Sequence, residues 1–202
     1  MEFGEVLSKR RMVRHYTEQP VSREALNRVV EAGRRAPSAG FSQGQAFVVV
    51  TDRTDRQAIA RLSDEDRYLA AGFDPWISQA PAHIVICTSE KAYRLRYQEA
   101  DKSSTGAEPN WPVPYWWVDA GAALQNILLA AVDEGLAAGF LGSHALPGLA
   151  DLLDIPADYQ PIGLVTVGHP APDRRSSSLD RGWRPKKEII HWNRWLRPDP
   201  PS

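Results

Sequence analysis

The chain has 202 residues, 43% of them apolar, and its 24 basic and 25 acidic residues leave a formal charge of −1. A chain of this size and apolar content can bury a substantial core, and we expect one domain over residues 1–202. Because binding to a nucleic-acid backbone needs a basic excess on one face, the balanced charge argues against a nucleic-acid partner.

The first part of the chain is predicted to form two helices. The opening MEFGEVLSKR contains no apolar run and no lipidation motif, so we expect a cytoplasmic protein. Residues 3–14 have a helical pattern and include three arginines, whose charge fits a solvated face and an anion site about equally well when taken alone. A second helix should follow Ser22, its expected N-cap, and end before Pro37.

The rest of the chain alternates strands with helices. Continuous apolar runs predict buried strands, and helical periodicity predicts surface helices. We expect strands at 46–51, 82–88, 138–142 and 161–168, and helices at 53–62 and 146–153. Cys87, the single cysteine, lies in one of these strands, so a buried and inert thiol is expected and an intrachain disulfide is excluded.

Two further segments differ strongly in polarity. Residues 89–117 are polar and contain proline, which in a compact domain indicates a lid or an insert. Residues 119–135 predict a helix buried on nearly every side, with Asp119 as its N-cap and Gly135 just after its end. This helix is too short and too polar to span a bilayer, so no membrane association is expected.

The C-terminal tail, residues 171–202, is charged but contains Trp183, Trp192 and Trp195. Tryptophan side chains at this density are rarely left in solvent. We therefore expect the tail to pack on another surface, in particular on a second subunit.

The sequence lacks the familiar constellations of side-chain catalysis. It contains no nucleophile elbow, no zinc-protease helix motif and no Gly-rich nucleotide loop. The five histidines are scattered, so structural roles are expected for them and no metal site is predicted; they are His15, His83, His144, His169 and His191. No catalytic side chain is assigned, because this pattern favours a protein in which a cofactor carries the chemistry.

Five short segments carry a recognisable pattern. They are RRMVRHY (10–16), APSAGFSQGQAF (36–47), DAGAALQNILLAA with GLAAGFLG (119–142), VGHP (167–170) and RPKKEIIHW (184–192). In this order and spacing they resemble the nitroreductase family of FMN-dependent oxidoreductases, over nearly the whole chain. The resemblance implies an α+β fold with a mostly antiparallel central sheet flanked by helices, and an intertwined homodimer with two interfacial FMN sites. The sequence pattern alone supports only a mixed α/β domain.

In the family, an R-R-x-x-R segment near the N-terminus holds the FMN phosphate and reaches the polar edge of the flavin. The counterparts in this chain are Arg10, Arg11, Met12 and Arg14. Guanidinium groups suit this role because they stay charged and bind phosphate oxygens in pairs. Arg184 matches a C-terminal phosphate contact of the family, although Gly182 stands where many members have lysine.

The second segment resembles the loop that lies against the flavin, often from the partner subunit. The residues implied as cofactor contacts are Pro37, Ser38, Ala39 and Gln43. The loop departs from the common pattern at Phe41, where asparagine is frequent, and at Gly44-Gln45, where proline-tryptophan is frequent. We assign Phe41 to the substrate pocket, and the departures affect the expected substrate preference.

The remaining assignments concern hydrogen-bond donors and the pocket wall. By resemblance, the backbone that faces flavin N5 and O4 is that of Leu141, Gly142 and Ser143, although the same glycines also suit a plain helix end and core strand. Trp111 and Tyr115 are expected in a lid over the pocket, whereas Trp117 is expected in the core. Packing of this segment on the following helix explains the aromatic residues equally well.

The resemblance implies a ping-pong oxidoreductase in which NADH or NADPH reduces FMN and a planar, electron-poor acceptor such as a nitroaromatic or a quinone is then reduced. Two alternatives stay open. The same fold could serve another flavin reaction, such as dehalogenation or flavin fragmentation, or the protein could bind and sequester flavin with little turnover.

Overall fold

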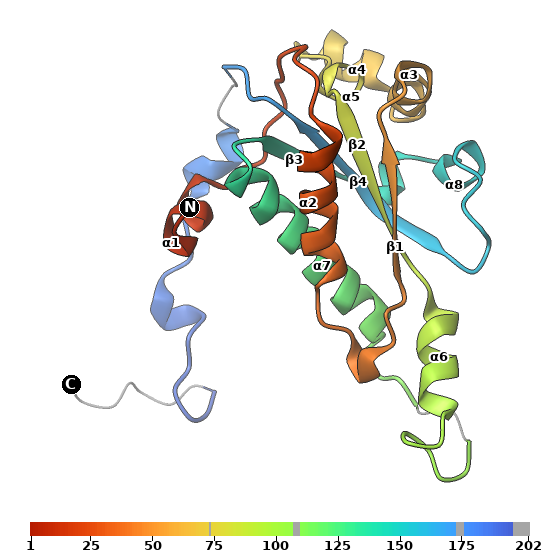
Figure 1. Cartoon of the computed structure of the whole chain (residues 1–202). Coiled ribbons are helices and arrows are strands. Elements are labelled where there is room, and N and C mark those ends of the chain that lie inside the picture. The colour runs from red at the N-terminus through yellow and green to blue at the C-terminus, as the bar shows by residue number, and fades with distance from the viewer. Residues whose placement is uncertain (73, 107–109, 173–175, 196–202) are drawn as a thin grey trace.

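The computed structural model describes residues 1–72, 74–106, 110–172 and 176–195. Its centre is a four-stranded sheet in the order β1-β2-β4-β3, and each neighbouring pair of strands is antiparallel (Figure 1). The strands are β1 (Gln45–Val50), β2 (Ala82–Thr88), β3 (Ala137–Gly142) and β4 (Gln160–Gly168). An antiparallel sheet flanked by helices confirms the expected α+β fold.

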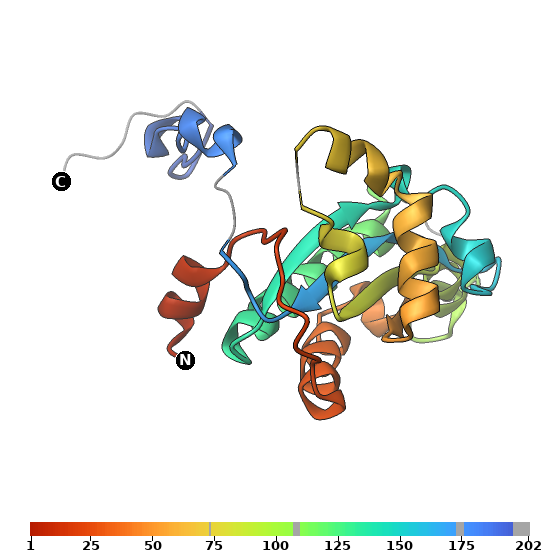
Figure 2. The ribbon, with the colours of Figure 1, turned by 90° about the horizontal axis from the view of Figure 1, so that it is seen from above.

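Helices cover both faces of the sheet. One layer consists of α2 (Arg23–Arg34) and α7 (Tyr115–Asp133). The other consists of α3 (Arg53–Leu62), α5 (Trp76–Gln79) and α8 (Leu149–Leu152). Figure 2 shows α2 and α3 on opposite sides of the strands. The predicted helix at 53–62 and strand at 82–88 are confirmed at both ends, whereas the helix expected at 146–153 is shorter.

Side chains of β2 alternate between two apolar cores. Ile84 and Ile86 pack with α2 and α7, whereas Val85 and Cys87 pack with the helices on the other face. Burial raises the pKa of the Cys87 thiol to about 11, which confirms a buried cysteine with little thiolate at neutral pH.

The N-terminal prediction is correct for α2 and wrong for the first helix. Ser22 caps α2, since its side chain accepts the backbone N–H of Ala25. The first helix, α1 (Phe3–Lys9), ends before the arginines instead of continuing to residue 14. The backbone after Lys9 is extended because residues 12 and 13 pair with β3 and cannot continue the helical ladder.

Segment 89–117 is more ordered than expected from its polarity. It contains α6 (Glu90–Gln98), whose N-cap is Ser89, and α7 already begins at Tyr115. The expected start at Asp119 is therefore wrong by one turn, because the Asp119 side chain bonds distant groups instead of capping its own helix. Gly135, with φ +72°, follows the helix end as predicted.

Two burial predictions also need correction. β1 was expected to be a buried strand, but it forms one edge of the sheet and is mostly half-buried. Trp117 was expected in the core, but it is 40% exposed, and the neighbouring Trp116 is the buried side chain. Adjacent residues on a helix face directions about 100° apart, which explains why Trp116 is buried while Trp117 is exposed.

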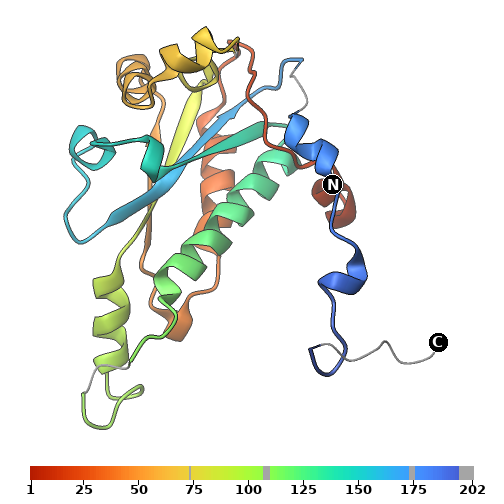
Figure 3. The ribbon, with the colours of Figure 1, turned by 180° about the vertical axis from the view of Figure 1, so that it is seen from behind.

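The remaining short elements lie at the ends of the sheet and in the tail. They are α4 (Glu65–Ala70) and the 3₁₀ turns η1 (Ala39–Phe41), η2 (Ser143–Ala145), η3 (Ser177–Arg181) and η4 (Lys186–Glu188). In Figure 3 the tail and α1 project from the body on the same side, away from α6. Trp183 is 96% exposed, so the described part of the tail leaves its tryptophans open to a further surface. Among the described residues, no helix combines the length and apolarity needed to cross a membrane.

The imidazole of His83 in β2 makes stability depend on pH. Its Nε2 bonds the carbonyl of Ile77 at 2.7 Å, and burial lowers its pKa from 6.5 to about 4. Between these two pKa values, the His83 imidazole is therefore protonated in the unfolded chain but neutral in the folded chain. This residue's contribution is fully present above pH 6.5 and is lost as the pH falls towards 4, by up to about 3 kcal/mol.

We therefore expect His83→Gln to flatten the pH dependence of the free energy of unfolding between pH 7 and pH 4.5, measured by urea denaturation. The exposed His144, replaced in the same way, is the control and should leave the slope unchanged. Identical slopes for His83→Gln and the wild type would contradict the assignment.

Candidate functional site

Residues 10–16, here called the arginine segment, run in extended conformation beside the start of β3. Met12 forms a parallel bridge with Ala138, and the N–H of Val13 donates to the carbonyl of Ala138 at 3.0 Å. The approach is close enough that a Cβ on Gly139 would lie 2.5 Å from the Val13 carbonyl oxygen. Glycine at this position is therefore what lets the two backbones meet.

Tyr16 anchors the arginine segment in the core. Its side chain is fully buried, and its hydroxyl contacts both the carbonyl of Val13 at 2.8 Å and Oγ1 of Thr166 at 2.7 Å. Thr166 Oγ1 in turn donates to the carbonyl of Gly139 at 3.3 Å. These bonds join the arginine segment, β3 and β4, so the backbone that carries the arginines is fixed before any ligand arrives.

The three guanidinium groups differ in their surroundings. Arg14 lies over the ring of the buried Trp76, with 5.6 Å from its Cζ to the ring centroid. Within the described part of the chain, the side chains of Arg10 and Arg11 form no hydrogen bond or ion pair. A fixed backbone with uncompensated positive charge is an arrangement that can bind an anion such as a phosphate.

Leu141, Gly142 and Ser143 lie at the other end of β3. The Leu141 side chain belongs to the core, whereas Ser143 is exposed and begins the turn η2. Gly142 has the ring of His144 against it, 2.8 Å from where a Cβ would stand. The strand thus offers backbone, and not side chains, at this end.

Residues 38–43, the Ser38–Gln43 loop, have a strained backbone. Gly40, Phe41 and Gln43 all have positive φ angles, of 62°, 58° and 50°. This conformation costs a residue with a side chain about 1–3 kcal/mol. The loop is closed internally, since the N–H of Gln43 donates to Ser38 Oγ at 3.0 Å. Phe41 is 72% exposed, so burial of its ring does not offset the strain.

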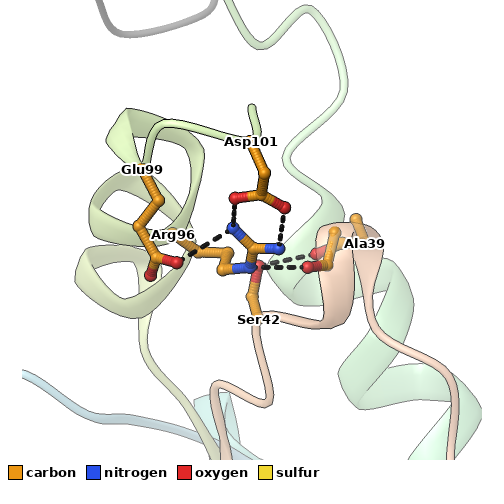
Figure 4. Close-up of polar contacts among 6 residues, drawn as sticks. Ala39, Ser42, Arg96, Glu99 and Asp101 are labelled. Carbon is orange, nitrogen blue, oxygen red and sulfur yellow. Dashed lines mark hydrogen bonds and ion pairs between the residues drawn. The ribbon is translucent and has the colours of Figure 1, made fainter. Parts of the chain in front are cut away.

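Contacts from two helices hold the Ser38–Gln43 loop. From α7, the buried Asp119 carboxylate accepts the N–H of Ala39 and the hydroxyl of Tyr93, each at 2.8 Å. From α6, Arg96 Nε donates to the carbonyl of Gly40 at 2.9 Å (Figure 4). Sequence reasoning missed Arg96 and Tyr93 and misread Asp119, because nothing local distinguishes them from ordinary helix residues.

An aromatic cluster lies next to this loop. Trp111 packs edge-on against Tyr97, Tyr115 and Trp116, with ring centroids 4.7 to 6.2 Å apart. Tyr115 is 41% exposed and Trp111 is half-buried, so the residues expected in a lid lie at the surface of this cluster.

The structure brings some of the expected site residues together and separates others. The arginine segment pairs with Ala138, which is level with the Ala82 end of β2, whereas the Ser38–Gln43 loop enters β1 level with Thr88. These are opposite corners of the sheet, roughly 25 Å apart from strand rise and spacing. Arg184, in the tail, pairs with Glu188 at 3.6 Å, and no bond to the arginine segment is present among the described residues.

No group of three or more histidine, cysteine, aspartate or glutamate side chains within the described ranges could hold a metal ion. The fold is that of an α+β protein with a four-stranded antiparallel sheet, and three arginines lie at one corner of this sheet. The sequence pattern of the nitroreductase family matches residues 7–169, and the chain belongs to this family.

The relatives support the same assignment. The chain is 30% identical to the NAD(P)H FMN reductase of Bacillus subtilis, over 96% of this chain and 74% of the relative. A Desulfovibrio desulfuricans protein described as a nitroreductase candidate, solved in complex with FMN, is 26% identical with a TM-score of 0.73, over 100% of this chain and 99% of its own. NfrA1 of Bacillus megaterium has the same fold, with a TM-score of 0.75 at 24% identity, over 98% and 76% of the two chains.

We expect Tyr16→Phe to lower the free energy of unfolding by about 1–3 kcal/mol, because the Val13 carbonyl and Thr166 hydroxyl lose a buried partner. Urea denaturation measures the change. Tyr115→Phe, at an exposed position, is the matched control and should have little effect. A Tyr16→Phe protein as stable as the wild type would show that this hydroxyl does not anchor the arginine segment.

Proposed function

We propose that the protein binds FMN and is an NAD(P)H-dependent oxidoreductase. The observation that carries the proposal is the arginine segment. Its backbone is fixed by β3 and Tyr16, while the guanidinium groups of Arg10 and Arg11 have no partner in the described residues. The residues present fit a phosphate-bearing cofactor. The names of the relatives, an FMN reductase and a nitroreductase candidate crystallised with FMN, point to the same cofactor.

Each part of the chain would have a separate role in holding the cofactor. Arg10, Arg11 and Arg14 would bind the phosphate, with Met12 beside them and Arg184 as a further contact from the tail. The backbone of Leu141–Ser143 would donate hydrogen bonds to the polar edge of the flavin. Pro37, Ser38, Ala39 and Gln43 would lie against the ring, where short side chains allow close approach.

The separation of these groups favours a homodimer in which each site is shared. A cofactor cannot span opposite corners of one sheet, so the Ser38–Gln43 loop would act on the site of a second copy. The exposed Trp183 and Trp195 and the open edge strand β1 offer the surface that such a partner would cover. We treat residues 1–202 as one domain of this dimer.

When bound, FMN supplies hydride transfer from NADH or NADPH to a second, planar and electron-poor acceptor, in ping-pong order. The residues of the chain position these molecules and exclude water. Phe41, Trp111 and Tyr115 would line the pocket for the flat acceptor, such as a nitroaromatic or a quinone, because aromatic rings stack on flat substrates. No side chain is needed as a nucleophile.

The direct test is the purified protein. We expect a yellow dimer that releases FMN, and not FAD, on denaturation. Its absorbance should bleach within seconds of adding NADH or NADPH without oxygen and recover with a quinone. Chromatography of the released cofactor and light scattering give the other two readouts. Finding no flavin would refute the proposal, whereas a flavin that NAD(P)H does not bleach would identify a binding protein.

The phosphate assignment is tested at Arg14. We expect Arg14→Ala to weaken FMN binding by about 1.5–3 kcal/mol, or about ten- to over a hundredfold, through loss of a charge-assisted bond. Riboflavin, which lacks the phosphate, should bind as before. Titration of both ligands into apoprotein measures the four affinities, and Arg35→Ala, at an exposed arginine just after the end of α2, is the control. An FMN affinity equal to that of the wild type would show that Arg14 is a solvated surface residue and does not bind the phosphate.

A further inference from the structure

The Ser38–Gln43 loop is held by side chains that lie outside it. Asp119 projects from the second turn of α7 and is 8% exposed. Its carboxylate accepts hydrogen bonds from the backbone N–H of Ala39 and from the Tyr93 hydroxyl, and among the described residues no arginine, lysine or histidine forms an ion pair with it. Burying a carboxylate without a cation costs free energy unless hydrogen bonds stabilise its charge. The bond to Ala39 is the one that leaves the helices and reaches the loop.

Tyr93 donates to the same carboxylate oxygen that accepts the N–H of Ala39. Burial and the neighbouring Asp119 raise the pKa of the Tyr93 phenol, so the hydroxyl stays protonated and donates. Gln45, the first residue of β1, contacts the same hydroxyl through Nε2 at 3.4 Å. These hydrogen bonds connect β1 to Ala39 through Tyr93 and Asp119. They fix the position of the loop backbone relative to α7.

The Arg96 side chain contacts the next residue of the loop, Gly40. Its Nε donates to the Gly40 carbonyl, while its two terminal nitrogens bond both oxygens of Asp101 at 2.6 and 2.7 Å and Nη1 also contacts Glu99 (Figure 4). The guanidinium is thus oriented by two carboxylates just after α6. Figure 4 also shows Ser42 closing the turn on the carbonyl of Ala39, at 2.6 Å.

We propose that Asp119 and Arg96 are positioning residues that hold the Ser38–Gln43 loop in its strained conformation and thereby present Phe41 as a specificity-determining side chain for the electron acceptor. The two contacts fall on consecutive residues, Ala39 and Gly40, immediately before Phe41. Asp119 accepts the N–H of Ala39, whereas Arg96 donates to the carbonyl of Gly40. Together they set the direction of the chain at Phe41, whose ring points outward and is 72% exposed.

The arrangement also connects the loop to the pocket wall. Residues 99–101, which orient Arg96, begin the segment that leads to the aromatic cluster around Trp111. Tyr97, one residue after Arg96, packs on Trp111 and closes over Gly40, where a Cβ would lie 2.6 Å from its ring. Loop and aromatic cluster are therefore held by the same helix, α6, so displacing Arg96 disturbs both sides of the acceptor pocket. The inference rests on the proposed function for the identity of the ligand. The role of Asp119 and Arg96 in fixing the loop does not depend on it.

The hold is tested by amide hydrogen exchange in the protein without FMN. The N–H groups of Phe41, Ser42 and Gln43 bond only to Ser38 and Ala39, so substitutions at Asp119 or Arg96 remove none of their bonds. We expect Asp119→Ala and Arg96→Gln each to raise exchange at these three amides about tenfold or more, and the double variant to do little further because either loss frees the loop. Arg34→Gln, which breaks a comparable bidentate pair with Glu31 on α2, is the control and should leave the loop unchanged.

Specificity is tested in the FMN-loaded protein. In Arg96→Gln we expect KM for a planar quinone to rise about tenfold, whereas the control Arg34→Gln should stay within twofold of the wild type. Phe41→Ala should raise KM for the quinone by a similar factor. Adding Arg96→Gln to Phe41→Ala should raise this KM no further. Unchanged loop exchange in both single variants, or faster exchange with unchanged quinone KM, would overturn the inference. Absence of FMN from the wild type would refute the proposed function, while the exchange experiment would still decide the role of Asp119 and Arg96.

Discussion

The burial of β2 on both faces is the constraint on which the rest of the structure depends. All seven residues of this strand are buried, and it lies between β1 and β4. Two layers of helices are needed to cover it, and they leave only the edges and ends of the sheet open to a ligand. The arginine segment occupies one such corner and the Ser38–Gln43 loop the opposite one. The proposed sharing of each cofactor site between two copies follows from this geometry, because one sheet cannot bring its own opposite corners together.

Those parts of the fold with strong local signals could be predicted from the sequence. Helix α3 was placed at both ends because its apolar residues recur with helical spacing, and the structure adds Asp52 as its N-cap. Residues 10–14 of the arginine segment were wrongly included in the first helix. Its residues are compatible with a helix, but Val13 bonds Ala138, a partner 125 positions away that no local pattern reveals. Asp119 was misread for the same reason, since its partner Ala39 is 80 positions distant.

The candidate site was predictable by residue type and family pattern, but not by arrangement. Arg10, Arg11 and Arg14 were identified, yet only the structure shows that their backbone is fixed by Tyr16. The positive φ angles of Phe41 and Gln43 could not be foreseen, because residues with side chains rarely adopt them and the bonds that enforce them come from elsewhere in the chain. Arg96 carries no local signal at all: on sequence it is one of many charged residues of a polar segment.

The bonds that anchor Tyr16 also set the order in which the protein folds. Tyr16 meets Thr166 across 150 positions, and Thr17 and Ala171 exchange backbone bonds with His169 and His15 in the same region. On the ribosome the arginine segment emerges first, whereas its partners Thr166 and His169 lie more than 150 residues into the chain. Local elements such as α2 and the β1-β2 pair can form earlier, since their contacts close shorter loops. The contacts that fix the arginine segment can therefore form only after β4 has been synthesised, so this candidate anion site is completed late in synthesis.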